Sequence, residues 1–306
     1  MSVRKTTIGY LFSAPAIILM IVILIVPVLI AGYLSLTDYA LGNAQINWIG
    51  LKNYDNLFNR SSYQKMLSAS FIYVGVTAPL SIGLGLGAAL LINSLTRFQD
   101  IYKAIYFLPV MAALLAMAIV WEFALHPTIG IVNKSLTAGC GSWLEEIEWY
   151  ARGCSSGFPH WLGDKSFTMA TICFIGVWQG FGFNMVLYLA GLTGVPRELY
   201  HAAEIDGAAT AWDRFRLVTW PMLGPTTVFV VTITMIRSFQ VFDTVEALTQ
   251  GGPSRSTYVM MYGIFEKGIQ QNLIGIGSAI TIVFLAFVLG LTLVQRWLVE
   301  RRMHYT

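Results

Sequence analysis

Three polar side chains lie close together in the sequence at the end of a long apolar stretch. Arg237, Gln240 and Asp243 follow an uncharged window that begins after Arg216. An Arg inside a membrane-spanning helix costs roughly 2.5–3.5 kcal/mol, so its guanidinium should face protein or water. One interpretation is a solute site or gate suited to hydroxyl or anionic groups. The others are a structural pair with Asp243 and an Arg237 side chain that reaches the membrane interface.

Two amides fall in a second uncharged stretch, between Lys165 and Arg197. Gln179 and Asn184 would face the same path as Arg237 if their helix lines it. Nothing indicates bond-making chemistry, because the four histidines are scattered and no Cys-x-x-Cys pair occurs. The sequence therefore predicts neither a metal site nor a catalytic site.

A further segment, residues 196–221, combines small and charged residues. Pro196 suits the first turn of a helix, where its missing N–H costs nothing, and Gly207 offers a stop in the left-handed conformation. A second helix beginning near Thr210 would run into the next apolar window. Small residues allow the backbone of another protein to approach closely: Ala202, Ala203, Gly207, Ala208 and Ala209. The segment is either a docking surface or only an amphipathic helix at the membrane surface.

Two of the three cysteines, Cys140 and Cys154, share one loop. In an oxidising compartment their pairing would close a loop of about 15 residues, worth ~3 kcal/mol by loop entropy. The alternative is two unpaired thiols. Cys173 lies in an apolar window and is predicted to be a small core residue.

The elements that position these residues must be membrane helices. Of the 306 residues, 56% are hydrophobic and only 11% are charged, whereas soluble domains carry about 25% charged residues. Too few charges remain to cover a water-facing surface, so most of the surface must face lipid. The net charge of +3 argues against nucleic acid as a partner.

Six windows without charged residues predict six transmembrane helices. A helix needs roughly 20 apolar residues to cross a ~30 Å hydrocarbon core, and the shortest window, after Lys103, continues as an apolar run to Leu125. The first is interpreted as a retained helix because its apolar run far exceeds a signal core. The alternation of a membrane barrel is absent. The predicted spans are about 8–36, 67–94, 104–125, 167–193, 217–241 and 270–295.

Basic residues predict the orientation of these spans. The side that holds both termini and residues 196–221 carries ten Lys and Arg in about 50 residues, against eight in about 100 on the other side. By the positive-inside rule, both termini lie in the cytoplasm. The loop with Cys140 and Cys154 then lies outside.

Residues 196–221 resemble the coupling signature of binding-protein-dependent ABC importer permeases: Glu-Ala-Ala, three residues, Gly, and a hydrophobic-x-Leu-Pro ending. Two further motifs resemble carbohydrate-type permeases of the maltose and glycerol-3-phosphate kind, at residues 49–54 and at residues 239–243 leading to 249–253. The resemblance covers nearly all 306 residues. The residues that match the coupling signature are Ala202, Ala203, Asp206, Gly207, Ala208, Phe215, Leu217 and Pro221.

The resemblance implies an all-α type I permease of the bacterial inner membrane, with residues 1–306 as a single transmembrane domain. In that family a short cytoplasmic helix sits in a cleft of a nucleotide-binding subunit, and ATP-driven closure swings two permeases from inward-facing to outward-facing. No Gly-x-x-x-x-Gly-Lys-Ser/Thr loop occurs in the chain. The implied partners are a second homologous permease (a heterodimer in this subgroup), two ATPase subunits that carry ATP and Mg, and a periplasmic solute-binding protein. The chain itself would bind no cofactor.

The segment departs from the family pattern at two residues. His201 stands where the family has its leading Glu, and Trp220 stands where Leu usually precedes the closing Pro221. Glu198 and Glu204, each three residues from His201, are candidates for the missing charge.

The expected function is transport of a sugar, polyol or glycerol-phosphate-like solute, with the substrate class taken from the resemblance alone. The alternative is a secondary transporter or channel that works without an ATPase. It would need a relay of acids inside the membrane, for which Glu122, at a helix end, is the only candidate. A membrane enzyme would need clustered His or acidic residues, which the sequence lacks.

Overall fold

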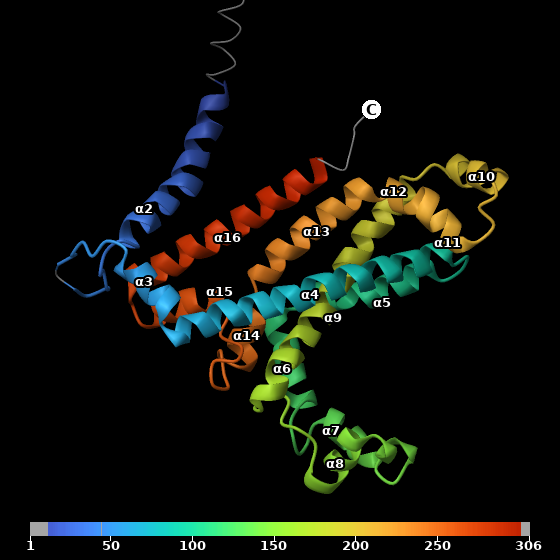
Figure 1. The fold of residues 1–306 in the computed structure, drawn as a ribbon, viewed down its shortest axis with the longest axis horizontal. Coiled ribbons are helices and arrows are strands. Elements are labelled where there is room, and N and C mark those ends of the chain that lie inside the picture. Colours follow the sequence, from blue (N-terminus) through green and yellow to red (C-terminus); the bar gives the residue numbers. More distant parts are fainter. Residues whose placement is uncertain (1–11, 44, 301–306) are drawn as a thin grey trace, which may run out of the picture. The chain divides into compact units, whose positions relative to one another are not determined.

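The structure is a computed structural model that describes residues 12–43 and 45–300. It is built from helices (Figure 1), and the described residues contain no strand beyond an isolated bridge between Thr37 and Trp48. The chain divides into two compact units. The first comprises Met1–Gln64 and Gly263–Leu289, and the second comprises Lys65–Tyr262 and Gly290–Thr306.

Within the described residues, five helices are long and apolar enough to cross a membrane, and a bent pair makes a sixth span if it is counted as one. The five are Phe12–Leu34, Ser61–Ser94 (α4), Lys165–Thr193 (α9), Gly224–Leu248 and Ile274–Gln295. The all-α architecture predicted from the uncharged windows is confirmed. Residues 8–11 of the first predicted span lie outside the described residues.

The third predicted span, 104–125, is not one straight helix. It consists of α5 (Gln99–Met111) and α6 (Leu114–Ala124), which are bent by 95° relative to each other. α5 packs against α9, whereas α6 packs against α14 (Asp243–Leu248). Hydropathy cannot indicate this break, because both halves are apolar and only their packing partners differ.

The fifth predicted span, 217–241, is also segmented. After α11 (Ala211–Arg214) the chain forms three consecutive helical segments. These are the π-helical turn η3 (Phe215–Thr219), α12 (Trp220–Met222) and α13 (Gly224–Phe239). A short non-helical link at residues 240–242 then leads to α14. The helical hydrogen-bonding pattern is therefore interrupted near the polar residues at the end of α13.

The first unit uses one buried amide to fix a helix end. α2 (Val26–Leu34) ends at Ser35, and the Nδ2 group of Asn53 in α3 (Lys52–Asn59) donates to the carbonyl oxygens of Ser35 and Thr37, at 2.8 Å each. These bonds satisfy carbonyls that a helix end leaves free. Residues 49–54, one of the family-like motifs, therefore anchor the loop after α2. The unit also contains η4 (Phe265–Gln270) and most of α16 (Ile274–Glu300), while α15 (Met260–Ile264) crosses the unit boundary.

In the second unit α9 is the central helix, and glycines set its contacts. Gly176 lies against Tyr73 of α4, Gly182 against the Tyr106 carbonyl of α5, and Gly191 against Thr226 of α13. A side chain at any of these positions would meet the neighbouring helix. Such close approach is typical of small residues in membrane helices.

Candidate functional site

A cavity of about 430 Å³ lies in the second unit among α4, α5, α9, α13 and the link to α14. Its lining includes all five residues that the sequence assigned to the solute path: Gln179, Asn184, Arg237, Gln240 and Asp243. Residues far apart in sequence therefore meet at one hollow. The size falls within the ≈300–1,000 Å³ range of ligand pockets.

Asn184 is the most buried of these residues, with only 1% of its surface exposed. Its Oδ1 atom accepts a hydrogen bond from the Thr234 hydroxyl of α13, at 2.8 Å. Its Nδ2 group has no hydrogen-bond partner. A buried donor without a partner costs about 1–3 kcal/mol, so the Nδ2 group of Asn184 is an unsatisfied donor in a residue that lines the cavity.

Arg237 lies with its guanidinium carbon 4.1 Å from the ring centroid of Phe183. A cation over an aromatic face is attracted by the ring quadrupole. Within the described residues, Arg237 forms neither an ion pair nor a hydrogen bond through its side chain, so the structural pair with Asp243 is not formed. Arg237 is instead an unpaired cation on a cavity wall.

Gln240 and Asp243 lie where the chain leaves α13. Gln240 follows the last residue of that helix, and its backbone N–H is within hydrogen-bond distance of the Ile236 and Arg237 carbonyls. Asp243 is the first residue of α14. Gln240 therefore reaches the cavity from the link between the helices and Asp243 from the start of α14, and not from one continuous helical face.

Three hydroxyl residues of α4 also line the cavity, and the sequence reasoning missed them. Tyr73, Thr77 and Ser81 are spaced four residues apart and therefore share one face of α4. Thr77 donates to the Tyr73 carbonyl and Ser81 to the Thr77 carbonyl, at 2.5 and 2.7 Å. Their spacing was a usable signal, but uncharged hydroxyl residues do not interrupt an apolar window.

At the end of α9 beyond this cavity, residues 195–219 form a small folded unit, here called the elbow module. α10 (Arg197–Ile205) is followed by Gly207 with a φ of 96°, which confirms the predicted left-handed turn. Thr210 caps α11 through a reciprocal pair of hydrogen bonds with Asp213. The Thr210 hydroxyl and backbone N–H, both donating to the carboxylate, hold the pKa of Asp213 below its ordinary value.

The elbow module has its own core, and this corrects one expectation. Ala203 and Ala208 are buried against Val195 and Val218. They hold α10 onto η3 and so do not form an open surface, whereas Ala202, Gly207 and Ala209 are exposed. An alanine stripe looks the same in sequence whether it faces its own fold or another protein.

One further contact joins α10 to the segment that leads into α13, and an aromatic row runs along that segment. The hydroxyl groups of Tyr200 and Thr219 are 3.0 Å apart and share a hydrogen bond. Phe215 stacks on Trp212, with ring centroids 5.4 Å apart, and lies 6.0 Å from Trp220, just before Pro221 of α12. Trp220, which replaces the family's Leu, thus extends an aromatic row along this helix.

Some charged side chains of the elbow module interact with other side chains of the module, and others have no ion pair in the described part of the chain. Glu204 accepts a hydrogen bond from Arg214 at 2.5 Å and lies 3.8 Å from His201. Glu198 is exposed and has no ion pair within the described part of the chain, and Asp206 is an exposed residue at the end of α10. Of the two candidates for the missing family charge, Glu198 is therefore the free one.

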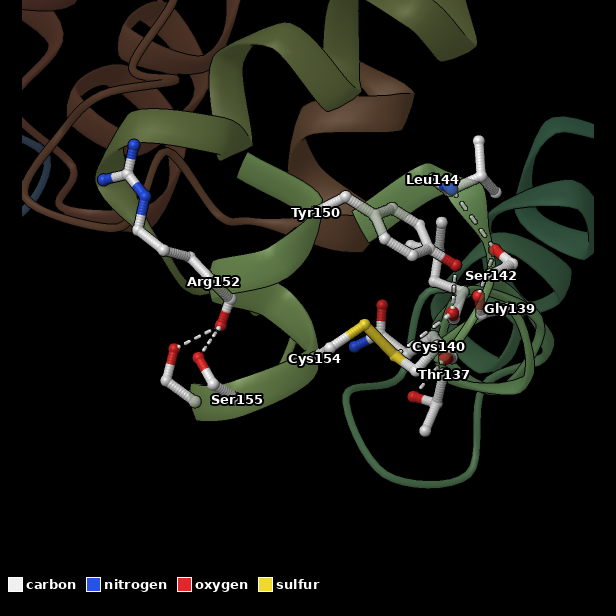
Figure 2. Close-up of a disulfide and its surroundings, with 12 residues drawn as sticks. Thr137, Gly139, Cys140, Ser142, Leu144, Tyr150, Arg152, Cys154 and Ser155 are labelled. Atoms are coloured by element: carbon white, nitrogen blue, oxygen red, sulfur yellow. Dashed lines mark hydrogen bonds between the residues drawn. A yellow bond between two sulfur atoms is a disulfide. The ribbon is translucent and has the colours of Figure 1, made fainter. Parts of the chain in front are cut away.

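At the other end of α9, residues 126–164 form a second folded unit, here called the cap. It contains α7 (Ile131–Ala138), a 3₁₀ turn η2 (Trp143–Glu146) and α8 (Glu148–Ser156). Figure 2 shows the disulfide that joins Cys140 and Cys154, whose Cα atoms are 5.8 Å apart. The structure thus pairs the two loop cysteines, while Cys173 is a buried free thiol.

One side chain in the cap makes three hydrogen bonds. Asn133, with 5% of its surface exposed, donates to the Pro127 and Pro159 carbonyls at 3.1 and 3.4 Å and accepts from the Trp161 indole at 2.6 Å. Tyr150 donates to the Leu136 carbonyl at 2.5 Å. These bonds tie the two ends of the cap together.

The geometry of α9 separates the two modules. The helix has 29 residues, which gives about 43 Å at 1.5 Å per residue. The cap precedes its first turn and the elbow module follows its last. A membrane-spanning α9 therefore places them on opposite sides of the bilayer, with the cavity residues of α9 in between.

Comparison with known proteins gives a family match over most of the chain. The family described as "Binding-protein-dependent transport system inner membrane component" matches residues 59–304. The probable ABC transporter permease protein YurN of Bacillus subtilis is 29% identical over 95% of this chain and 96% of its own length. The sn-glycerol-3-phosphate transport system permease protein UgpA of Agrobacterium fabrum is 28% identical over 97% and 96%.

A solved structure shares the fold along the whole chain. A chain of a bacterial ABC transporter involved in the import of the acidic polysaccharide alginate superposes with a TM-score of 0.79, at 20% identity, covering 99% of this chain and 98% of that one. A second structure of the bacterial alginate ABC transporter, in complex with alginate pentasaccharide-bound periplasmic protein, gives the same TM-score.

Proposed function

Because the chain belongs to the family of binding-protein-dependent transport system inner membrane components, we propose that it forms half of an import path for a sugar, polyol or glycerol-phosphate-like solute. The chain is a transport subunit and not an enzyme. The solute class is supported by relatives whose names include sn-glycerol-3-phosphate and arabinooligosaccharide transport system permeases. The observation that carries the proposal is the elbow module, a small folded unit that follows α9 and leads through α12 into α13; α9 and α13 both line the cavity.

The elbow module is proposed to dock on an ATPase subunit in the cytoplasm. Its exposed surface offers Glu198, His201 and Ala202, with Ile205 87% exposed beside the Gly207 turn. An apolar side chain so exposed, next to small and charged neighbours, suits insertion into a cleft of another protein. Asp206 and Glu204 lie at the rim of the same surface.

The buried contacts of the module provide a route for force. Ala203 and Ala208 pack against Val218, and Tyr200 bonds to Thr219 in the helix that continues through Pro221 into α13. A displacement of α10 by a closing ATPase therefore moves the start of α13. α13 carries Thr234 and Arg237 at the cavity, so the proposed docking site is connected to the solute path through η3, α12 and α13.

The remaining partners are proposed from the family and from the cap. A second homologous permease would complete the path, two ATPase subunits would hold ATP and Mg, and both termini would lie in the cytoplasm. A periplasmic solute-binding protein would dock on the other side, where the disulfide of the cap is favoured by an oxidising compartment. The alginate transporter structure contains such a periplasmic protein.

Reconstitution tests the proposal directly. The permease pair, with and without its ATPase subunits, is placed in liposomes with the associated binding protein and a radiolabelled solute that this protein binds. We expect uptake that needs both ATP and the ATPase subunits. Uptake driven by an ion gradient without the ATPase would contradict the proposal and favour a secondary transporter.

A further inference from the structure

We propose that the transported solute is an anion, a polyhydroxyl compound bearing a carboxylate or phosphate, and that Arg237 binds its charged group. The inference rests on the proposed function, because it concerns the solute path of that permease. It begins from a charge that the fold leaves without a partner.

An unpaired Arg in a membrane span is costly unless water or a ligand meets it. Arg237 lines the cavity and, within the described residues, has no ion pair and donates no hydrogen bond through its guanidinium. Its one contact of note is the face of Phe183, at 4.1 Å. Such stacking orients the planar guanidinium while leaving its N–H groups free, and these match the two oxygens of a carboxylate or phosphate.

Asn184 adds a second donor to the same cavity. Its Nδ2 group is buried and has no partner, while its Oδ1 atom is already occupied by the Thr234 hydroxyl. The unsatisfied hydrogen-bonding capacity of Asn184 therefore lies in its N–H groups. An acceptor-rich ligand satisfies them together with Arg237.

The α4 wall offers the opposite hydrogen-bonding capacity. The hydroxyl hydrogens of Thr77 and Ser81 are engaged by backbone carbonyls of their own helix, so their oxygens present lone pairs. These oxygens accept hydrogen bonds from solute hydroxyl groups. The cavity therefore combines donors suited to an anionic group with acceptors suited to a polyhydroxyl skeleton.

Asp243 is the other charged residue that lines the cavity. It stands at the first residue of α14 and, within the described part of the chain, forms no ion pair with Arg237. Its charge also repels a solute anion, so the charged group of the solute is expected beside Phe183 and Asn184.

Matched pairs of solutes test this assignment in the whole transporter. The assembled complex, in nanodiscs without its binding protein, is titrated with glucuronate and glucose and with sn-glycerol 3-phosphate and glycerol, at constant ionic strength, and its thermal unfolding is followed. We expect the anion of at least one pair to stabilise the complex at a concentration at least about tenfold lower than its neutral partner, as for one charge-assisted contact. Arg237→Gln should abolish that difference.

Three variants sharpen the outcome. Arg237→Lys keeps the positive charge but lacks the paired N–H donors of the guanidinium, so it should retain part of the anion preference. Asp243→Asn should increase the anion preference, because it removes a negative charge that repels the anion. Arg255, whose guanidinium lies 5.1 Å from the Tyr258 ring but does not line the cavity, is the matched control. Arg255→Gln should leave the preference unchanged.

The proposal is overturned by an equal response to both members of each pair, by no response to any of the four, or by a preference that survives Arg237→Gln. If the Arg237→Gln variant does not assemble, the anion preference of Arg237→Lys is compared with that of the wild type. An equal preference in the two proteins also overturns the proposal. ATP-driven uptake is measured separately. If ATP-driven uptake persists but no anion preference is found, the assignment of an anionic solute is wrong and the proposed permease function still stands.

Discussion

The cap and the elbow module, at the two ends of α9, are held in shape by different kinds of interaction. The cap is fixed by a disulfide between Cys140 and Cys154 and by the three hydrogen bonds of Asn133. The elbow module has four small buried aliphatic residues, a hydroxyl–hydroxyl hydrogen bond, a capping box and one partly exposed ion pair. The first is covalently closed, whereas the second depends on weak contacts.

This difference suits the partners proposed for the two ends. A covalently closed cap keeps its shape without help, as suits a surface that a separate protein meets and leaves. An elbow of small residues has little stability of its own, because each buried alanine contributes little apolar area. Docking on a partner would stabilise it, so its shape and its partner should be coupled.

The strongest test places the same backbone strain in both modules. Gly207 and Gly157 have φ values of 96° and 94°, and a Cβ at either position would meet no atom within 4 Å. Valine there costs about 1–3 kcal/mol through conformation alone. We expect Gly207→Val to reduce ATP-driven uptake more than about tenfold, because the strain changes the direction of α10, and Gly157→Val to reduce it less than about threefold.

Uptake is measured in liposomes, with ATPase co-purification as the second readout. Helix content by circular dichroism serves as the control for folding of both variants. Equal losses in the two variants would mean that the elbow is no more sensitive to shape than the cap. The contrast between the modules would then be wrong.

The next test removes the covalent bond from the cap. Cys140→Ser with Cys154→Ser should destabilise the cap by ~3 kcal/mol, the loop-entropy value for a closure of this length. Hydrogen exchange of α7 and α8 should rise more than about tenfold, while exchange in α10 stays unchanged. Mass spectrometry of alkylated wild-type protein, before and after reduction, checks that the two thiols become reactive only after reduction. Unchanged exchange in α7 and α8 would show that Asn133 and Tyr150 suffice to hold the cap.

Local features of both modules could be predicted from the sequence. The turn at Gly207, the helix start near Thr210 and the candidate pair Cys140 and Cys154 depend on residues close together in the chain. Each carries its own signal, such as a glycine after helix formers or two cysteines in one loop. The six apolar windows likewise gave the all-α fold, because membrane solvation depends on composition.

Other features depend on which element packs where, and for most of them the sequence carried no signal. The 95° break between α5 and α6 lies inside one apolar window, since both sides meet apolar partners. The inward direction of Ala203 and Ala208 follows from the core they share with Val218. The lining of the cavity was predicted only in part, because the hydroxyl residues of α4 look like ordinary members of an apolar helix.

The smallest expected effect concerns one ion pair in each module. Glu204 and Arg214 connect α10 to α11 with side chains 46% and 37% exposed, whereas Glu148 and Arg152 are one turn apart in α8 and 87% and 71% exposed. Exposed pairs contribute about 0–1 kcal/mol, so Glu204→Gln should lower uptake by no more than about fivefold. Glu148→Gln should have no measurable effect on uptake, because its ion pair lies within one helix and joins no two elements.

The exchange Glu204→Arg with Arg214→Glu should restore uptake if the pair acts by joining the two helices. Failure of the exchange, with Glu204→Gln still impaired, would mean that Glu204 acts instead by contacting the ATPase, which gives the missing family charge to Glu204 and not to Glu198.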